Sequence, residues 1–261
     1  MSIHRARDGA VEIITLSRPD VLNAFDDEMG AALVEAVSAA AETPEVRCIV
    51  ITGAGRAFSS GEDLGALASG YRAGRAPDLG ATLRDRYNPL IRAVTSAPKP
   101  VVAAVNGVAA GAGASLALAC DFRIASDRAK LVLAFIKVGL VPDSGAIWFL
   151  TKMVGAARAW ELCASGDPLD AAAAHDLGLF NRVVPPEAFE SEWRSFAERL
   201  AAGPTRAYAL TKELARAAAE SPLDEQLERE VDAQAAAGRT EDHLEGVMAF
   251  LEKRAPGFRG E

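Results

Sequence analysis

The chain has 261 residues, half of them apolar and a quarter charged, which is an ordinary composition for a globular protein. This length allows one or two domains with a sizeable core and excludes a disordered chain or a small disulfide-dependent scaffold. Lys and Arg number 28 against 36 Asp and Glu, so the net charge is −8, and we find no basic stripe that would bind nucleic acid.

The cysteines and histidines give no sign of a metal or disulfide site. Cys48, Cys120 and Cys163 are scattered, and the three histidines lie far apart in the sequence. We expect buried free thiols and no metal or redox cofactor. The N-terminus lacks the apolar stretch of a secretory signal, so we also expect a cytoplasmic protein.

Apolar periodicity predicts strands alternating with helices over roughly the first 180 residues. The expected strands are 10–16, 46–52, 100–105, 121–126 and 131–135. The expected helices are 26–41, 83–96, 112–119, 144–154, 156–164 and 170–177. Residues 65–82 are rich in Gly, Ala and Pro without a clear period, and we expect a mobile loop there. The pattern predicts an α/β fold with buried, largely parallel strands, although no fixed-period repeat is visible in the sequence.

One uncharged segment, 101–120, is long enough to suggest a membrane span and contains Gly107-x-x-x-Gly111. Its glycines and asparagine, with Pro98 and Pro100 just before it, favour a strand, a turn and a buried helix instead. We therefore expect no contact with a membrane.

The composition changes after Pro185-Pro186, where Ala, Glu and Arg become frequent. Four further helices are expected, at 187–201, 204–219, 222–237 and 241–254. We predict a core over 1–190 and an all-helical region over 191–261, which either caps the core or makes oligomer contacts.

Common nucleotide and hydrolase motifs are absent. Thr52-Gly53-Ala54-Gly55 follows a strand, but the third glycine of a dinucleotide fingerprint would fall at Phe58. Neither a P-loop nor Gly-x-Ser-x-Gly occurs, so NAD binding, nucleotide hydrolysis and Ser-His-Asp catalysis are not expected.

Two glycine-rich turns each follow a buried strand: Phe58–Leu64 (FSSGEDL) and Gly111-Ala112-Gly113. Such turns can direct free backbone N–H groups at one point, and a helix N-terminus strengthens the effect. Each glycine set is also explained by tight turns alone. Together the two turns indicate an anion site.

A third feature is the carboxylate of Asp143 in the apolar loop GLVPDSG at 139–145. Either Asp143 or Ser144 caps the following helix, or Asp143 is partly desolvated. Desolvation would raise its pKa and make it a useful base near neutral pH.

These stretches together resemble the crotonase (enoyl-CoA hydratase/isomerase) superfamily along nearly the whole chain. The resemblance is carried by Arg18-Pro19 with Asn23-Ala24, ITGAGRAFSSGEDL at 51–64, KPVVAAVNGVAAGAGASLALACDFRIAS at 99–126, GLVPDSG at 139–145 and EGVMAFLEKRAPGF at 245–258. Residues 78–94 and 139–150 most resemble the branch that isomerises ring-1,2-epoxyphenylacetyl-CoA and Δ3,Δ2-enoyl-CoA. The resemblance implies a spiral of ββα units with a helical trimerisation tail, and homotrimers or homohexamers.

The resemblance also implies roles for individual residues. The backbone N–H groups of Glu62 and Ala112 would form an oxyanion hole for the thioester carbonyl. The two catalytic glutamates of hydratases are replaced here by Ser115 and Phe135. Asp143 falls where isomerases of the family keep their single base, so the resemblance implies an isomerase.

The substrate implied is a coenzyme A thioester, with no further cofactor. Arg56 falls where a family lysine meets the 3′-phosphate of CoA, and Ser60 is expected at the same site. Gly65 stands where the family has another basic residue, which weakens the expectation of strong phosphate binding. Phe250 and Lys253 match tail residues that a neighbouring subunit lends to the CoA site.

Some alternatives stay open at this point. Phe135, Trp148 and Tyr87 either form walls of an acyl pocket or simply pack in the core. Besides an isomerase, the sequence allows an enoyl-CoA hydratase with unusual residues, another crotonase-type lyase, a hydrolase or dehalogenase with Asp143 as nucleophile, and a non-catalytic protein that binds CoA esters.

Overall fold

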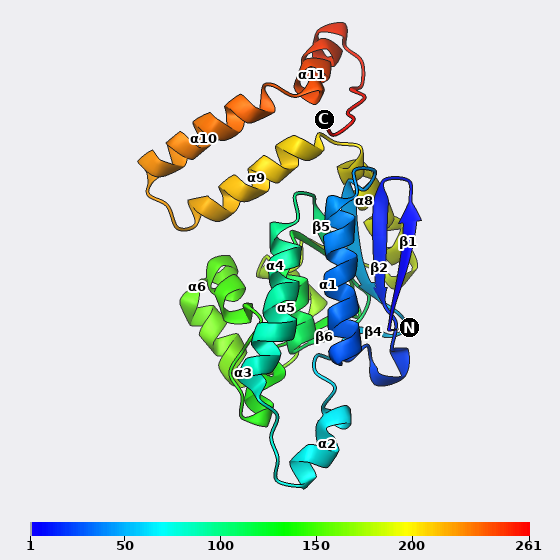
Figure 1. Ribbon diagram of the computed structural model, residues 1–261, viewed down its shortest axis with the longest axis vertical. Coiled ribbons are helices and arrows are strands. Elements are labelled where there is room, and N and C mark those ends of the chain that lie inside the picture. Colours follow the sequence, from blue (N-terminus) through cyan, green and yellow to red (C-terminus); the bar gives the residue numbers. More distant parts are fainter. Residues whose placement is uncertain (1) are drawn as a thin grey trace.

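Between residues 48 and 132, successive strands alternate between two sheets in the computed structural model, which describes residues 2–261 (Figure 1). The first sheet has the order β1-β2-β3-β5-β7-β10. Its strands are β1 (Ile3–Asp8), β2 (Val11–Leu16), β3 (Cys48–Gly53), β5 (Val101–Val105), β7 (Phe122–Ser126) and β10 (Arg182–Val184). The second sheet consists, in order, of β4 (Ala57–Ser59), β6 (Val108–Ala110), β8 (Lys130–Val132) and β9 (Leu169–Asp170).

The chain passes from the first sheet to the second three times, through β3–β4, β5–β6 and β7–β8. Pairing is parallel except for β1 with β2 and β8 with β9. This is the expected spiral of ββα turns in an α/β fold. The repeat is one of backbone path and not of residue identity, which explains why the sequence shows no fixed period.

The middle strands of the first sheet are buried on both faces, as their continuous apolar runs predict. Val50 lies opposite Val102, and both belong to an apolar cluster that α8 covers with Trp193. Ile49 and Ile51 face the larger core. The two faces of the first sheet are therefore covered by different helices.

Helices of the spiral cover the sheets, with α1, α4 and α5 on the face shown in Figure 1. They are α1 (Asp27–Glu42), α4 (Asn88–Ser96), α5 (Ala112–Ala119), α6 (Ala146–Ser165), α7 (Ala171–Asp176) and α8 (Pro186–Ala201). In α1 the Asp26 carboxylate accepts a hydrogen bond from the backbone N–H of Met29 at the N-cap. Met29, Leu33 and Val37 then bury one stripe of that helix, as their spacing predicts.

The C-terminal helices form a separate layer that projects from the body in Figure 1. They are α9 (Thr205–Ala218), α10 (Leu223–Ala237) and α11 (Glu241–Glu252), and α9 packs antiparallel to α10. Arg47 ties this layer to the core through the Thr205 hydroxyl, 3.0 Å away, and the Phe258 carbonyl, 2.8 Å away. The division between 190 and 191 stays a prediction, and α8 spans it.

Three local predictions are wrong. Residues 65–82 are not simply a loop, because they contain most of α2 (Leu64–Arg72) and all of α3 (Leu79–Thr82). The Asp63 and Asp78 carboxylates cap these helices, accepting from backbone N–H groups at 3.0 and 2.9 Å. The strand predicted at 131–135 is confirmed only at its start, because β8 ends at Val132 and a 3₁₀ turn, η3 (Ala134–Val138), replaces the rest.

The third miss concerns strands that the sequence did not predict, the short β4, β6, β9 and β10 and also β1, which pairs with β2 along its whole length. Only Ile3 of its six residues is buried, so little apolar alternation marks it. The predicted break between two helices near residue 155 is confirmed, since Gly155 has φ +76° and ψ 161° within α6. The connecting elements are a 3₁₀ turn, η1 (Pro19–Val21), and a π-helical turn, η2 (Leu83–Tyr87).

The three cysteines are buried and free, as expected. Among residues 2–261, no group of His, Cys, Asp and Glu side chains is placed to hold a metal ion. In the same range, the helices are all too short or too polar to cross a membrane.

Candidate active site

The two glycine-rich turns lie against each other, as the anion-site hypothesis requires. Gly61 has φ +87°, and a Cβ there would lie 2.8 Å from the Ala110 carbonyl oxygen and 3.2 Å from the Ala112 nitrogen. Only glycine permits this approach. Gly111, at φ +51°, precedes α5 and has no side chain to cap it, so Ala112 begins the helix with an N–H that lacks an intrahelical acceptor.

The first turn is held in place by an arginine from a distant part of the chain. Arg18 donates to the Ala24 carbonyl at 2.6 Å and to the Asp63 carboxylate at 2.9 Å. Phe25 pairs with Glu62 in a short parallel bridge, so the Glu62 backbone is fixed on both sides. These contacts give a structural reason for the Arg18-Pro19 and Asn23-Ala24 segment that carried part of the resemblance.

A cavity of about 230 Å³ opens beside the two turns. Most of its lining is apolar, from α2, α3, η2 and the segment that leads into α6, and includes Leu64, Leu67, Leu83, Phe135, Leu140 and Val141. Glu62, Ala112, Asp143 and Ser60 line the same cavity. The structure thus brings together four of the seven site residues predicted from the sequence, in a mostly apolar pocket with a few polar groups.

Asp143 lies in the loop between η3 and α6. Its Oδ1 accepts a hydrogen bond from the Ser144 hydroxyl at 2.8 Å, and its backbone carbonyl accepts one from the Ser115 hydroxyl at 3.1 Å. Ser144 holds φ +52°, a conformation that is uncommon outside glycine. The N-cap of α6 is Gly145 without a side-chain cap, so the capping alternative is wrong for both Asp143 and Ser144.

The environment of Asp143 shifts the pKa of its carboxyl upward. Burial raises the pKa of this carboxyl, and the negative charge of Glu62 raises it further, while the Ser144 hydrogen bond and the positive charge of Arg86 lower it. The net direction is upward, as a base that works near neutral pH requires. Among the described residues, no hydrogen bond reaches the second carboxylate oxygen, Oδ2.

Glu62 contributes a second carboxylate, although the sequence predicts a role only for its backbone N–H. Its Oε2 accepts hydrogen bonds from the Arg86 guanidinium and the Tyr87 hydroxyl, both in η2. Arg86 also pairs with Asp27 of α1 at 2.9 Å. Burial and the charge of Glu62 raise the pKa of Tyr87, so its hydroxyl keeps its proton. Two features of the sequence could have indicated this pair: the acid Glu62 directly after Ser60-Gly61, and the isolated basic stretch Arg84-Asp85-Arg86.

The remaining predicted site residues lie outside this cavity. Arg56 is exposed on the connection between β3 and β4. Phe250, which is 82% exposed, and Lys253 lie at α11, at the opposite end of the molecule from α2 in Figure 1. A single chain therefore does not bring them to the Asp143 cavity. Ser60 lines the cavity, but its hydroxyl donates to the Val21 carbonyl at 3.2 Å.

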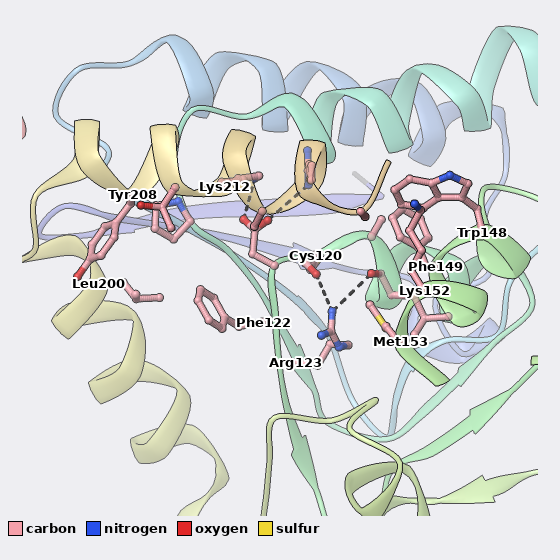
Figure 2. A pocket seen from close by; sticks show the side chains of 18 residues that line it. Cys120, Phe122, Arg123, Trp148, Phe149, Lys152, Met153, Leu200, Tyr208 and Lys212 are labelled. Atoms are coloured by element: carbon pink, nitrogen blue, oxygen red, sulfur yellow. Dashed lines mark hydrogen bonds and ion pairs between the residues drawn. The ribbon is translucent and has the colours of Figure 1, made fainter. Parts of the chain in front are cut away.

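A second, larger cavity of about 530 Å³ lies between α6, α9 and the core (Figure 2). Trp148 lines this cavity and not the Asp143 cavity, whereas Phe135 and Tyr87 line the latter. Its charged groups are paired: Asp121 binds Lys212 at 2.7 Å and Arg216 at 3.5 Å. Arg123 donates to backbone carbonyls in the interior, among them that of Cys120 at 2.6 Å (Figure 2).

Two turns that meet beside an apolar pocket, with a desolvated carboxylate in the same lining, could bind the oxygen of a carbonyl compound and accept a proton from it. Comparison with known proteins specifies the class. A family described as "Enoyl-CoA hydratase/isomerase" matches residues 6–261. The chain is 45% identical over 251 residues to 1,2-epoxyphenylacetyl-CoA isomerase of Escherichia coli K12, covering 96% of this chain and 95% of the relative.

Further relatives have different activities in their names. Trans-2-decenoyl-[acyl-carrier-protein] isomerase of Streptococcus mutans is 34% identical, with 97% of this chain and 96% of the relative covered. A crystal structure of an enoyl-CoA hydratase from Polaromonas sp. JS666 superimposes with a TM-score of 0.92 at 40% identity, covering 98% of this chain and 99% of that one. The chain belongs to the enoyl-CoA hydratase/isomerase (crotonase) family and is an enzyme of that family.

Proposed function

We propose that this enzyme is an acyl-CoA isomerase that shifts a C=C bond from C3 to C2 of an enoyl-CoA, with Asp143 as its single base. The observation that carries the proposal is the position of Asp143 in the cavity beside the Glu62 and Ala112 turns. Ser115 and Phe135, which stand at the two positions of the hydratase glutamates, supply no carboxylate for the addition of water.

The proposed reaction uses the Asp143 carboxylate twice. It removes the C2 proton of a 3-enoyl thioester, which leaves a dienolate, and it then returns that proton at C4. The N–H groups of Glu62 and Ala112 bind the thioester oxygen and stabilise the negative charge that develops on it. A carboxyl with a raised pKa suits both halves of this transfer, because it must accept and release the same proton.

The apolar lining of the cavity supports an acyl group that is hydrocarbon in character. The E. coli relative is named for a substrate with a ring epoxide. We propose a straight 3-enoyl chain or a ring-1,2-epoxyphenylacetyl group as the acyl part, since the base that deprotonates C2 can also assist opening of the epoxide to an oxepin.

We further propose that the CoA site is completed by assembly into a homotrimer or homohexamer. Exposed Arg56 would meet the 3′-phosphate, and exposed Phe250 and Lys253 of a neighbouring copy would contact the CoA moiety. Light scattering of the purified protein tests the assembly. A monomer at micromolar concentration would contradict this part of the proposal.

A paired absorbance assay tests the reaction. One sample receives a 3-enoyl-CoA and the other crotonyl-CoA, and the conjugated 2-enoyl thioester is followed in both. We expect absorbance to rise in the first and to stay constant in the second. A fall with crotonyl-CoA would indicate hydration, and would overturn the single-base mechanism. If both samples stay constant, ring-epoxyphenylacetyl-CoA is offered next, and no turnover there would leave a CoA-ester-binding protein as the better account.

A further inference from the structure

The Asp143 cavity contains two carboxylates, and the proposed reaction needs only one. Glu62 and Asp143 line the same cavity from different elements, the β4–α2 connection and the loop before α6. Each has one oxygen held by hydroxyl or guanidinium donors. Among the described residues, no hydrogen bond is made to Oδ2 of Asp143 or Oε1 of Glu62. The backbone role proposed for Glu62 does not explain why an acidic side chain stands there.

The Glu62 carboxylate is fixed by two buried donors. Arg86 is 9% exposed and Tyr87 is 4% exposed, and both donate to the same oxygen, Oε2. Arg86 is itself confined, because a Cβ added at Gly30 of α1 would lie 2.5 Å from its Cγ and Cδ. The orientation of the Glu62 charge relative to Asp143 is therefore determined by the packing of η2 against α1.

A fixed negative charge near a second carboxylate disfavours ionisation of that carboxylate. In this site the effect has the expected sign: Glu62 raises the pKa of Asp143, and Arg86, which pairs with Glu62, lowers it. The other titratable groups that line the cavity are Tyr87 and Tyr71. Lys137, on η3, pairs with Asp167 at 2.9 Å and both side chains are exposed, so they are screened.

We propose that the side chain of Glu62 is a positioning residue for proton transfer: its charge, held by Arg86 and Tyr87, makes Asp143 a stronger base. This inference rests on the proposed function for its kinetic consequence, but its electrostatic part concerns the free protein alone. When Asp143 accepts the C2 proton it becomes neutral, and the repulsion from Glu62 is relieved. The charge of Glu62 therefore favours the step in which the proton moves to Asp143.

The test compares Glu62→Gln with the native protein. The glutamine keeps the backbone N–H of the proposed oxyanion hole and nearly the same shape, and it removes the charge. The titration of the Asp143 carboxyl is followed by NMR in protein carrying ¹³C-labelled aspartate, with Asp143→Asn used to assign the resonance. We expect the midpoint to fall by about 0.5 pH unit or more in Glu62→Gln. The acid limb of kcat/KM should shift by the same amount, with a several-fold lower kcat and a KM within about twofold.

Matched variants separate charge from structure. Glu62→Asp retains the charge and should restore much of the native midpoint. Asp27→Asn removes the outer, solvent-exposed partner of Arg86 without touching Glu62, and should leave the midpoint unchanged within about 0.2 unit. If Glu62→Gln does not fold, as judged by circular dichroism, Glu62→Ala removes the charge without an amide against Arg86 and replaces it in the test.

Two results would overturn the inference. One is an Asp143 midpoint that does not move in the charge-free variant, whatever happens to kcat. The other is an equal shift in Asp27→Asn, which would assign the effect to loosening of Arg86. Failure of the isomerase proposal is recognised separately. In that case the native protein and all variants show no isomerisation, while the NMR titrations of Asp143 can still be compared.

Discussion

The cavity between α6 and α9 and the Asp143 cavity differ in size and in how their carboxylates are paired. The cavity between α6 and α9 is more than twice as large, at about 530 Å³ against about 230 Å³. Its carboxylate, Asp121, is paired with Lys212 and Arg216. In the smaller cavity Asp143 has a raised pKa and one carboxylate oxygen without a donor among the described residues. Removing one partner of a buried ion pair destabilises the fold, whereas an incompletely paired carboxylate is available for chemistry.

The strongest test of this contrast is Asp143→Asn. The variant keeps the shape of the side chain but cannot accept a proton, so we expect kcat/KM for isomerisation to fall about 10³-fold. Binding of a saturated acyl-CoA, measured by calorimetry, should change less than about threefold, because the apolar lining and backbone donors remain. Activity within tenfold of the native enzyme would show that Asp143 is not the base.

The oxyanion hole is tested by removing one N–H. Ala112 is the first residue of α5, a position where proline is tolerated, so Ala112→Pro deletes the donor with limited effect on the helix. We expect kcat to fall about 10²- to 10³-fold. Ala112→Gly keeps the N–H and serves as the control, with kcat within about fivefold of native. Equal losses in the two variants would contradict a role for this N–H.

A substitution in the larger cavity should lower the stability of the protein and leave its activity unchanged. Lys212→Met removes the nearer cationic partner of Asp121. It leaves a partly buried carboxylate with the Val101 backbone N–H at 2.9 Å and the longer contact to Arg216. We expect the free energy of unfolding in urea to fall by about 2 kcal/mol. The kcat/KM of the folded fraction should stay within twofold. A large loss of kcat/KM at full foldedness would show that the two cavities are coupled.

The smallest expected effect concerns pH and stability. The pKa of Asp143 is higher in the folded protein than its ordinary value of 3.8, so this group stabilises the fold only at low pH. That stabilisation is lost as pH rises through the folded pKa. Asp143→Asn should therefore have a Tm about 2 °C or more above native at pH 7, with the difference vanishing near pH 4. A lower Tm for the variant at pH 7 would contradict the desolvated state of Asp143.

Much of the fold follows from local patterns. Residues 112–119 were predicted as a buried helix and form α5 with those bounds, because a Gly-rich turn is followed by small apolar residues. The helical tail follows from spacing and caps, such as Thr240, whose hydroxyl accepts from the His243 backbone N–H at 3.0 Å. Strand β1 escaped prediction because hydrogen bonds to β2, and not an apolar face, hold it in the sheet.

The sequence by itself determined most of the helices, the central strands of the first sheet, the two glycine turns and the isolated Asp143, since each depends on neighbouring residues. Tertiary structure alone decided that Gly61 lies against Ala112 and that Glu62 meets Arg86 and Tyr87 from η2. It also decided that Asp121 pairs with Lys212 and Arg216. These contacts join residues that are 24 to 95 positions apart in the sequence. Local propensity carries no information about such distances, and the electrostatics of a carboxylate depend on them.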